Sequence, residues 1–349
     1  MTRLLRPVLL PGLARLWRDR HTLQLGLDPG RAVLVEVANP AVVRVLDLLD
    51  GTHTDRAVLA HAAKLRITAE DARALIDALR GAGLVVGAQH LLPTPLPEPM
   101  RQRLSAEAAA LALRGTDAPA TPAQILRRRA ASTVVITGRG RLAVPVALAL
   151  AQAGVGHVRP ELTGDVAPSD IAGGGLAAAD LRRPKAEAVV EAITRTAPGT
   201  DTRPVRRGFA TLVVQAGADR PAALMAAGYA QRRQPHLVLA VRDGTAVVGP
   251  LVRAGGTPCL NCLDLHRQDR DPAWPGLAAQ LARTAGPEAC AAPTVIAAAG
   301  YAAAEVLTFL DGGTPETVGA ATEISSPARM RRRAWPPHPA CACCRRIRR

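Results

Sequence analysis

Short apolar runs near the start of the chain follow a pattern typical of a β-hairpin. Residues 22–27 and 31–37 are two such runs on either side of the turn sequence Asp28-Pro29-Gly30, and proline followed by glycine is a strong turn signal. Helical patterns follow over residues 40–51, 54–65 and 68–83, and a short apolar run at 84–86 predicts a closing strand. Residues 1–90 therefore predict a small α+β unit with the outline of a winged helix.

Residues 91–130 break this pattern. Prolines at alternate positions in residues 91–100 oppose both a helix and a β-ladder, so we expect an extended linker there. One helix is expected over residues 102–114, and a loop rich in Pro, Thr and Ala then leads to Arg129. The stretch is expected to separate two domains.

From residue 131 onward, strands, glycine turns and helices alternate. Residues 132–158 contain an apolar run, a glycine turn, a helical stretch, a second glycine turn and another apolar run. Further strands are expected at 211–216 and 236–241, and further helices at 185–195, 221–231 and 293–310. Such alternation is typical of a parallel sheet with crossover helices. The predicted fold class is therefore α/β, with a Rossmann-like domain over residues 131–349.

The composition restricts the classes of function. A chain of 349 residues fits two domains, and its 44 Lys and Arg against 29 Asp and Glu give a formal net charge of +15. A positive charge suits phosphate-rich partners. The arginines are nevertheless scattered along the chain, apart from runs at 127–129, 329–333 and 345–349, and aromatic residues that stack on bases make up only 2%. Nucleic-acid binding is therefore not the favoured function.

The sequence also indicates a compartment. No apolar run approaches the roughly 20 residues that cross a membrane, and the apolar part of residues 1–12 is too short for a signal peptide. The first 258 residues contain no cysteine, and all six cysteines follow. Clustered cysteines of this kind indicate metal ligands in a reducing compartment rather than a disulfide framework. We therefore expect a cytoplasmic protein without membrane contact.

Cysteine spacing gives the strongest chemical signal. Cys259 and Cys262 form a Cys-x-x-Cys pair, and Cys341 and Cys344 repeat the spacing later in the sequence. Two such pairs can hold one Zn²⁺ in a closed Cys₄ site, which is structural because no position remains for substrate. Cys343 is an alternative to Cys344, and two unrelated pairs of reduced thiols are the competing interpretation.

Two further residues near these pairs need an interpretation. His338 is a distant choice for a zinc ligand. Cys290 belongs to neither pair, and a small buried residue near a helix start explains it better than a catalytic thiol. We expect no catalytic residue among them.

A glycine turn at residues 138–143 ends one predicted strand and starts a helix. Gly138 permits the tight turn, and Gly140 lets the backbone approach a phosphate held by amides at the helix N-terminus. Glycines that only pack a helix against a strand give the same pattern. Both interpretations stay open on the motif alone.

Three landmarks in order make the second domain similar to a known family. They are "GRGRLAVPVALALAQAGVGHV", the helix start "RRPKAEA", and a Cys-x-x-Cys just after a glycine-rich hairpin. With them, residues 131–344 resemble the ThiF-like superfamily of adenylating proteins, which are related to ubiquitin-activating enzymes. The resemblance implies dimerisation through the flank of the sheet, so a homodimer is one expected assembly.

The same resemblance implies that ATP and Mg²⁺ are not cofactors here. The family's ribose-binding acid falls at Leu162, and Glu161 would replace it only after a shift of register. The family's metal-binding aspartate falls at Ala218, and Arg141 stands where the family prefers a small residue. Only Lys185 of the usual ATP-binding set is kept. The residues of this degenerate nucleotide site are Gly138, Gly140 and Lys185.

The N-terminal unit resembles the PqqD-like domains that recognise leader peptides of ribosomally made, modified peptides. The hairpin, the helix end "LDLLDG" and the stretch "LIDALRGAGLV" carry that resemblance. A PqqD-like domain fused to a degenerate ThiF-like domain resembles the TOMM precursor leader peptide-binding proteins, also called bacteriocin biosynthesis cyclodehydratase-domain proteins.

This second resemblance implies a function for the whole chain. It implies a non-catalytic scaffold that captures a precursor leader peptide and presents it to a separate YcaO-type cyclodehydratase. One alternative is an ATP-dependent adenylating enzyme that acts on a carboxylate. The other is a basic winged-helix regulator that binds nucleic acid.

The leader peptide is expected to bind along the outer strand of the hairpin. Unpaired backbone groups on such a strand can accept an added strand, and proline at Val35 is expected to weaken binding if the donor that it removes faces the peptide. The helix over residues 69–80 should form the other wall, with Arg73 and Arg80 placed to read an acidic leader. The strand residues are Ala32, Val33, Leu34, Val35, Glu36 and Val37.

Overall fold

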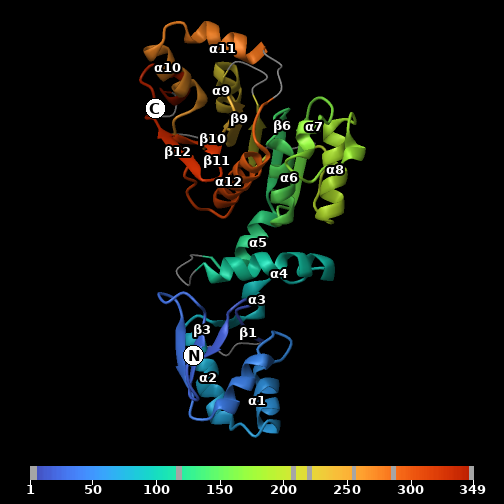
Figure 1. The fold of residues 1–349 in the computed structure, drawn as a ribbon, viewed down its shortest axis with the longest axis vertical. Helices are drawn as coiled ribbons and strands as arrows, with labels where there is room; N and C mark the ends of the chain where they lie inside the picture. The colour runs from blue at the N-terminus through green and yellow to red at the C-terminus, as the bar shows by residue number, and fades with distance from the viewer. Residues whose placement is uncertain are drawn as a thin grey trace. The chain divides into compact units, whose positions relative to one another are not determined.

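The chain forms two compact units, Met1–Arg127 and Arg128–Arg349. The structure is a computed structural model that describes residues 6–114, 120–205, 210–217, 222–253, 257–283 and 288–345. In Figure 1 the first unit runs from blue to teal and the second from green to red. Each unit has an apolar core of its own.

The predicted hairpin forms in the first unit. Strand β3 (Thr22–Leu25) pairs antiparallel with β4 (Val33–Glu36). Strand β2 (Arg15–Trp17), which the sequence analysis missed, pairs with the other side of β3. Its three residues are all exposed, so it lacks the alternation that marks a half-buried strand. The sheet order is β2-β3-β4, and within the described residues β4 is an edge strand.

Three helical segments pack with this sheet around one apolar core. They are the 3₁₀ helix η1 (Pro40–Leu48), α1 (Asp55–Lys64) and α2 (Ala69–Gly81). The Thr68 hydroxyl caps α2 by accepting a hydrogen bond from the Asp71 amide at 3.0 Å. The closing strand β5 (Val85–Gly87) pairs with β1 (Pro7–Leu9), which was not predicted.

Helical segments occupy much of residues 88–130, and one of them confirms the helix that was expected over residues 102–114. They are α3 (Ala88–Leu91), α4 (Glu98–Leu113) and α5 (Pro122–Ala130). Two expectations are wrong, because α4 starts inside the proline-rich segment and α5 replaces the loop before Arg129. Proline is tolerated in the first turn of a helix, where its missing N–H has no helical acceptor. Both helices carry proline in that turn, and the boundary between the two units falls within α5.

A seven-stranded sheet organises the second unit, in the order β12-β11-β10-β9-β8-β6-β7. The four predicted strands are parallel to one another. They are β6 (Thr133–Gly138), β7 (His157–Leu162), β8 (Leu212–Ala216) and β9 (His236–Arg242). Three antiparallel strands extend the sheet, β10 (Thr245–Val252), β11 (Ala320–Ser326) and β12 (Arg329–Ala334). The arginine run at 329–333 is thus part of a strand whose residues are all exposed.

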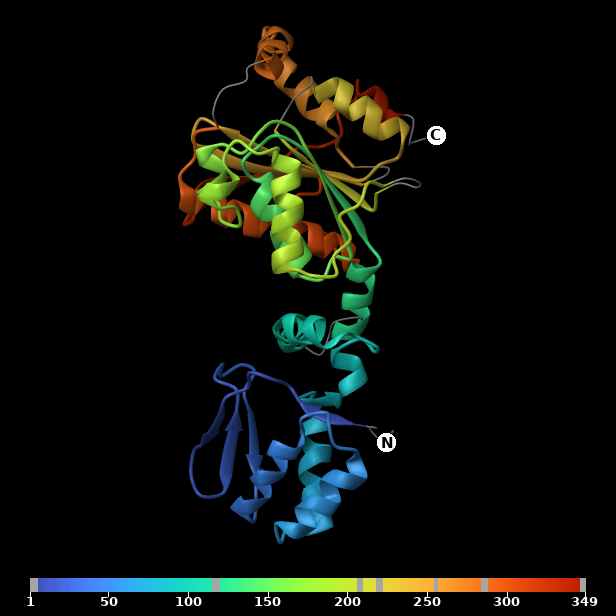
Figure 2. The same cartoon turned by 90° about the vertical axis from the view of Figure 1, so that its right-hand side faces the viewer.

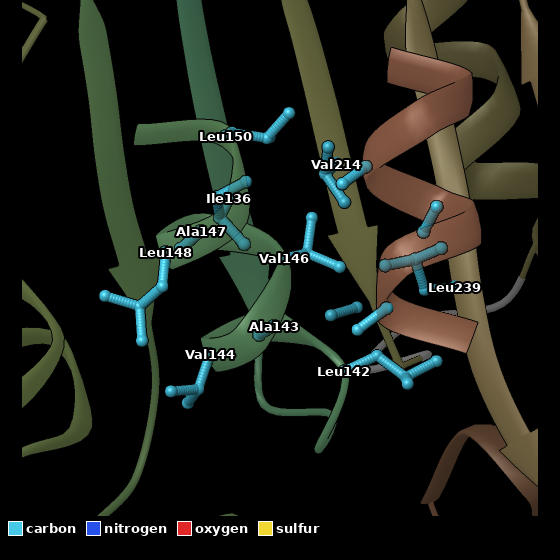
Figure 3. Packing of buried hydrophobic residues seen from close by; sticks show 14 of the residues in the cluster. Ile136, Leu142, Ala143, Val144, Val146, Ala147, Leu148, Leu150, Val214 and Leu239 are labelled. Carbon is cyan, nitrogen blue, oxygen red and sulfur yellow. The ribbon is translucent and has the colours of Figure 1, made fainter. Parts of the chain in front are cut away.

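Helices cover both faces of this sheet (Figure 2). On one face, α6 (Ala143–Gln152), α8 (Lys185–Thr196) and α12 (Ala292–Leu310) form the main core with the strands. Figure 3 shows side chains of β6, α6, β8 and β9 sharing this aliphatic interior. On the other face lie α9 (Ala222–Gln231) and α10 (Leu260–Arg270). The remaining helical segments are α7 (Pro168–Ile171), η2 (Ala178–Asp180), α11 (Trp274–Arg283) and α13 (Ala342–Arg345).

Among the described residues, one helix, α12, is both long enough and apolar enough to cross a membrane. The sequence analysis expected no such segment. Half of α12 is buried inside the unit (50%), and its Val295, Ala298 and Val306 side chains belong to the main core. Burial in the core therefore accounts for its apolar sequence.

A buried ion pair fixes the end of α5 to the end of α12. Arg129 is fully buried, and its Nε and Nη2 donate to the two carboxylate oxygens of Asp311 at 2.8 and 2.7 Å. Its Nη1 donates to the Ala153 carbonyl at 3.2 Å. Two parallel N–H bonds to one carboxylate are a strong arrangement. Arg129 is therefore a structural residue and not part of a solvated basic cluster.

Candidate functional site

The cysteines of the two Cys-x-x-Cys pairs come together in the second unit. Cys259 is the N-cap of α10 and Cys262 lies in its first turn, whereas Cys341 immediately precedes α13 and Cys344 lies within it. The Sγ atoms of Cys259 and Cys341 are 3.6 Å apart, and those of Cys262 and Cys344 are 3.4 Å apart. Cys259 Sγ lies 3.9 Å from both Cys262 Sγ and Cys344 Sγ. The four thiols are free and buried.

These distances suit four thiolates around one tetrahedral ion. A Zn–S bond of about 2.3 Å places tetrahedral sulfurs about 3.8 Å apart. Hydrogen-bond donors also point at the sulfurs, because the Asn261 side-chain amide lies 3.3 Å from Cys341 Sγ and the His338 amide lies 3.3 Å from Cys262 Sγ. Donors of this kind support metal-bound thiolates. The residues present therefore fit a closed, structural zinc site.

The sulfurs differ in how readily they ionise. The hydrogen bond from the Cys259 thiol, aided by the His338 amide, lowers the pKa of Cys262 to about 4. Burial raises the pKa of Cys344 to about 12. Because Zn²⁺ binds thiolates, metal uptake displaces the protons that the cluster holds and is therefore weaker in acid.

Neighbouring groups lie outside the four-sulfur cluster. Cys343 is half-buried and is not one of the four residues whose sulfurs lie within 4.8 Å of one another. The ring of His338 has partners at both nitrogens, since its Nε2 lies 2.8 Å from Asp269 Oδ2 and its Nδ1 accepts from the Ala340 amide at 3.1 Å. His338 thus holds the chain next to Cys341, and it is not placed as a ligand. Cys290 lies elsewhere, where its carbonyl accepts from Arg141 at 2.8 Å.

The glycine turn lies at the carboxyl ends of β6 and β8, where α/β sheets of this kind bind nucleotides. Gly138 has a φ of +102°, and a Cβ at this position would lie 2.1 Å from Ala216 O. No other residue type fits there. The amides of Arg139 and Gly140 both donate to Ala216 O at 3.1 Å. Two of the amides that could face a phosphate therefore face the interior of the protein.

Arg141 and Glu288 cover the open side of this turn. The Arg141 amide donates to Glu288 Oε2 at 2.7 Å. The buried Arg141 guanidinium donates to the carbonyls of Ser169, Glu288 and Cys290 at 3.2, 3.0 and 2.8 Å. The Arg141 side chain thus lies across the entrance to α6 and ties it to the chain around Glu288.

Lys185 lies beside the turn but is fully engaged. Its Nζ is 2.9 Å from Asp170 Oδ2 and donates to Arg139 O at 3.1 Å. Both side chains of the ion pair are buried, and a buried pair loses much stability when one partner is removed. The lysine charge is therefore neutralised within the protein.

The described residues do not fit a bound ATP–Mg²⁺. Leu162 ends β7 as a buried apolar residue, and Glu161 before it is exposed. Ala218 lies outside the described residues. Adenylation needs a carboxylate-held Mg²⁺ to offset the phosphate charge, and the buried carboxylate of Asp170 is paired with Lys185. This site gives adenylation no support.

Strand β4 leaves alternate backbone groups open. The Val37 amide donates to His21 O at 2.8 Å across the hairpin. In an antiparallel pair, every second residue bonds to the partner strand, so Val35 and Val33 also face β3. The backbone groups of Leu34 and Glu36 therefore point away from it. Both side chains are exposed, Leu34 by 50%. The donor expected at Val35 belongs to the hairpin, and the outward donors are those of Leu34 and Glu36.

A groove of about 390 Å³ lies beside the start of β4. Ala32 and Val33 form one side, and Ala82, Gly83 and Leu84, which directly follow α2, form another. The groove therefore adjoins the end of α2, and the remaining lining comes mainly from residues 10–14, 26–31 and 112–113.

The two arginines expected to read a peptide are in different situations. Arg80 donates to Asp77 at 2.8 Å, within its own helix. Arg73 is exposed on α2 and has no charged partner within the described residues. Arg73 is therefore the better candidate for contact with an acidic ligand.

Two residues at the glycine turn were missed by the sequence analysis. Glu288 lies 147 residues beyond Arg141, and no local pattern connects them. Asp170 gives a weak local signal, because it accepts from the Ala167 amide at 2.9 Å as the third residue after a helix start. Its pairing with Lys185 could not be inferred from that signal.

Comparison with known proteins places the chain in a family. The sequence profile of the ThiF family matches residues 114–344, and no curated protein matches the chain in sequence. The fold is similar to that of E. coli MccB solved with MccA-N7isoAsn, with a TM-score of 0.64 and 17% identity over 97% of this chain and 99% of that one.

Two other solved structures give the same result. The microcin C7 biosynthetic enzyme MccB in complex with N-formylated MccA has a TM-score of 0.63 and 16% identity, and it covers 97% of this chain and 99% of that one. PaaA has a TM-score of 0.64 and 19% identity, and the alignment covers 92% of this chain and 98% of the PaaA chain. Identities this low show a common fold only, whereas the profile match covers more than half of the chain. The chain belongs to the ThiF family.

Proposed function

We propose that this protein captures a ribosomally made precursor peptide by its leader segment and presents it to a separate YcaO-type cyclodehydratase. The observation that carries the proposal is the open edge of β4. Outward backbone groups at Leu34 and Glu36 alternate there with groups bonded to β3, so an extended peptide can add a fourth strand to the sheet.

The groove at the start of β4 supports the same proposal. An added strand would gain affinity from backbone hydrogen bonds, while a side chain in an adjoining groove supplies selectivity. The groove of about 390 Å³ next to Ala32 and Val33 is large enough for one or two apolar side chains. Arg73, exposed on α2, would favour a leader with acidic residues. Leu34, Glu36 and the adjoining groove form the proposed peptide site, and Arg73 is a further candidate contact on α2.

Zinc is the proposed structural cofactor of the second unit. Cys259, Cys262, Cys341 and Cys344 would hold one Zn²⁺ and thereby join the start of α10 to α13. The reduced state of these thiols suits the cytoplasm, where we propose that the protein acts. A homodimer through the flank of the ThiF sheet remains part of the proposal.

The structural neighbours agree with a role in peptide natural-product assembly. MccB is described as a microcin C7 biosynthetic enzyme, and it has been solved with MccA, with ATP and with AMPCPP. This chain shares that fold but engages Lys185 with Asp170 and closes the turn with Arg141. We therefore propose a binding partner in place of an adenylating enzyme, and the nucleic-acid-binding alternative is not favoured.

Binding of a fluorescent leader peptide to the full-length protein tests the proposal. The peptide is taken from a precursor gene beside a YcaO-type enzyme gene. Leu34→Pro removes an outward donor and should weaken binding by roughly tenfold, since one backbone hydrogen bond contributes about 1 kcal/mol and proline also perturbs the strand. Leu34→Ala keeps the donor and is the matched control for the side chain.

Two outcomes would contradict the proposal. One is a folded Leu34→Pro variant that binds the leader as tightly as the wild-type protein. The other is peptide-dependent pyrophosphate exchange by the wild-type protein that is lost in Lys185→Ala, which would support the adenylating enzyme instead.

A further inference from the structure

Three consecutive amides of the glycine turn have partners within the protein. Arg139 and Gly140 donate to Ala216 O, and Arg141 donates to Glu288 Oε2 at 2.7 Å. A phosphate at the start of a nucleotide-binding helix needs such amides as donors. Of these three, the Arg141 amide is the one that points away from the strands, and it is bound to a carboxylate.

The carboxylate of Glu288 also lies where the glycines allow the closest approach. A Cβ added to Gly140 would come within 3.2 Å of Glu288 Oε1, and one added to Gly217 would come within 3.5 Å of the same atom. Glycine at such positions permits a ligand to approach the backbone. Here the group that uses this space is a side chain of the same protein.

Further contacts hold Glu288 in this position. The Arg141 guanidinium donates to the Glu288 and Cys290 carbonyls on the same segment, at 3.0 and 2.8 Å. Lys185 also binds the turn, at Arg139 O, and its charge is paired with Asp170 at 2.9 Å. The segment is therefore fixed by its backbone as well as by its carboxylate.

We propose that the Glu288 carboxylate occupies the place that a phosphate group would need at the N-terminus of α6, so that the family's nucleotide site is filled by an anion of the protein's own. A carboxylate at this position gains the same helix-dipole and amide stabilisation as a phosphate. It also repels a second anion across a short distance. This inference goes beyond peptide capture, because it assigns to Glu288 the obstruction of the phosphate position at the start of α6.

Calorimetric titration of the full-length protein with inorganic pyrophosphate and with ATP, each with and without Mg²⁺, tests this assignment. The wild-type protein should bind neither at millimolar concentration. Glu288→Ala should bind pyrophosphate at least about tenfold more tightly, because the Arg141 amide and the dipole of α6 become available. Glu187→Ala, which removes an exposed glutamate of α8, is the matched control and should behave as the wild type.

The two titrants distinguish the source of the phosphate. Binding of pyrophosphate alone by Glu288→Ala supports a phosphate site, and binding of both titrants supports a site that also accepts a nucleotide; either result supports the proposal. Binding of ATP without pyrophosphate would contradict it. If Glu288→Ala is insoluble, the same titrations are made with Glu288→Gln, which keeps the shape of the side chain but removes its charge.

The proposal is overturned if the soluble variants bind no better than the wild type, or if the wild type itself binds pyrophosphate or ATP tightly. Leader-peptide binding measured on the same variants should be unchanged, because the proposed peptide site lies in the first unit. A failure of this inference is thus distinguishable from a failure of the proposed function.

Discussion

Substitution of Cys341 by serine should release zinc and destabilise the second unit. Cys259 and Cys341 are 82 residues apart in the chain, so a metal bridge between them closes a long loop. The entropy lost by the unfolded chain on closing such a loop corresponds to about 4.5 kcal/mol at 25 °C. Spread over the unfolding entropy of roughly 220 residues, that difference lowers Tm by about 10 °C.

Cys343→Ser is the matched control, because Cys343 is two residues away and outside the four-sulfur cluster. Zinc content of the purified proteins, together with scanning calorimetry, provides the readout. The transition of the first unit should be the same in all three proteins, since none of its residues belongs to the cluster. Retention of one zinc per chain by Cys341→Ser, or an equal loss of zinc in Cys343→Ser, would refute the assignment of ligands.

Three other variants probe interactions away from the zinc cluster. Arg129→Ala leaves Asp311 as an unpaired carboxylate and should cost about 3–5 kcal/mol in urea unfolding of the second unit. Burial lowers the pKa of His236 to about 4, against about 6.5 for an unfolded histidine. Between about pH 4 and pH 6.5 the unfolded chain therefore binds more protons than the folded protein. About 2 kcal/mol of the free energy of unfolding is lost as the pH falls from 7.5 to 5. His236→Phe should remove this part of the pH dependence of unfolding. Thr68→Ala removes the cap of α2 and should lower the stability of the first unit by about 1 kcal/mol, measured by its thermal transition.

Local patterns explain why the centre of the second unit could be predicted. Residues 133–138 are mainly apolar and end in Gly138, and residues 143–151 form a continuous apolar run just after the glycine turn, so β6 and α6 carry their signals within a few residues. The hairpin of β3 and β4 was predicted for the same reason. The two cysteine pairs were recognised because metal ligands keep a fixed spacing along the chain.

The elements that were missed lack such local signals. β12 is exposed at every position, so its arginines show no alternation of apolar and polar residues. α5 begins at a proline, and one of its buried residues is the charged Arg129, whose partner Asp311 is 182 residues away. Glu288 meets Arg141 only because the chain returns to the end of β6 after 147 residues. Contacts of this length depend on the completed fold and leave no pattern in the sequence.

The open edges of the small sheet also affect how the protein behaves in the absence of a peptide. Leu16, Trp17 and Leu34 are 41, 47 and 50% exposed on the two outer strands, and an unpaired strand with apolar side chains favours pairing with a second copy. The charge of Glu36 at the end of β4 opposes such contacts. Concentrated protein is expected to self-associate through these edges, and co-expression with the proposed leader peptide is expected to raise the yield of monodisperse material.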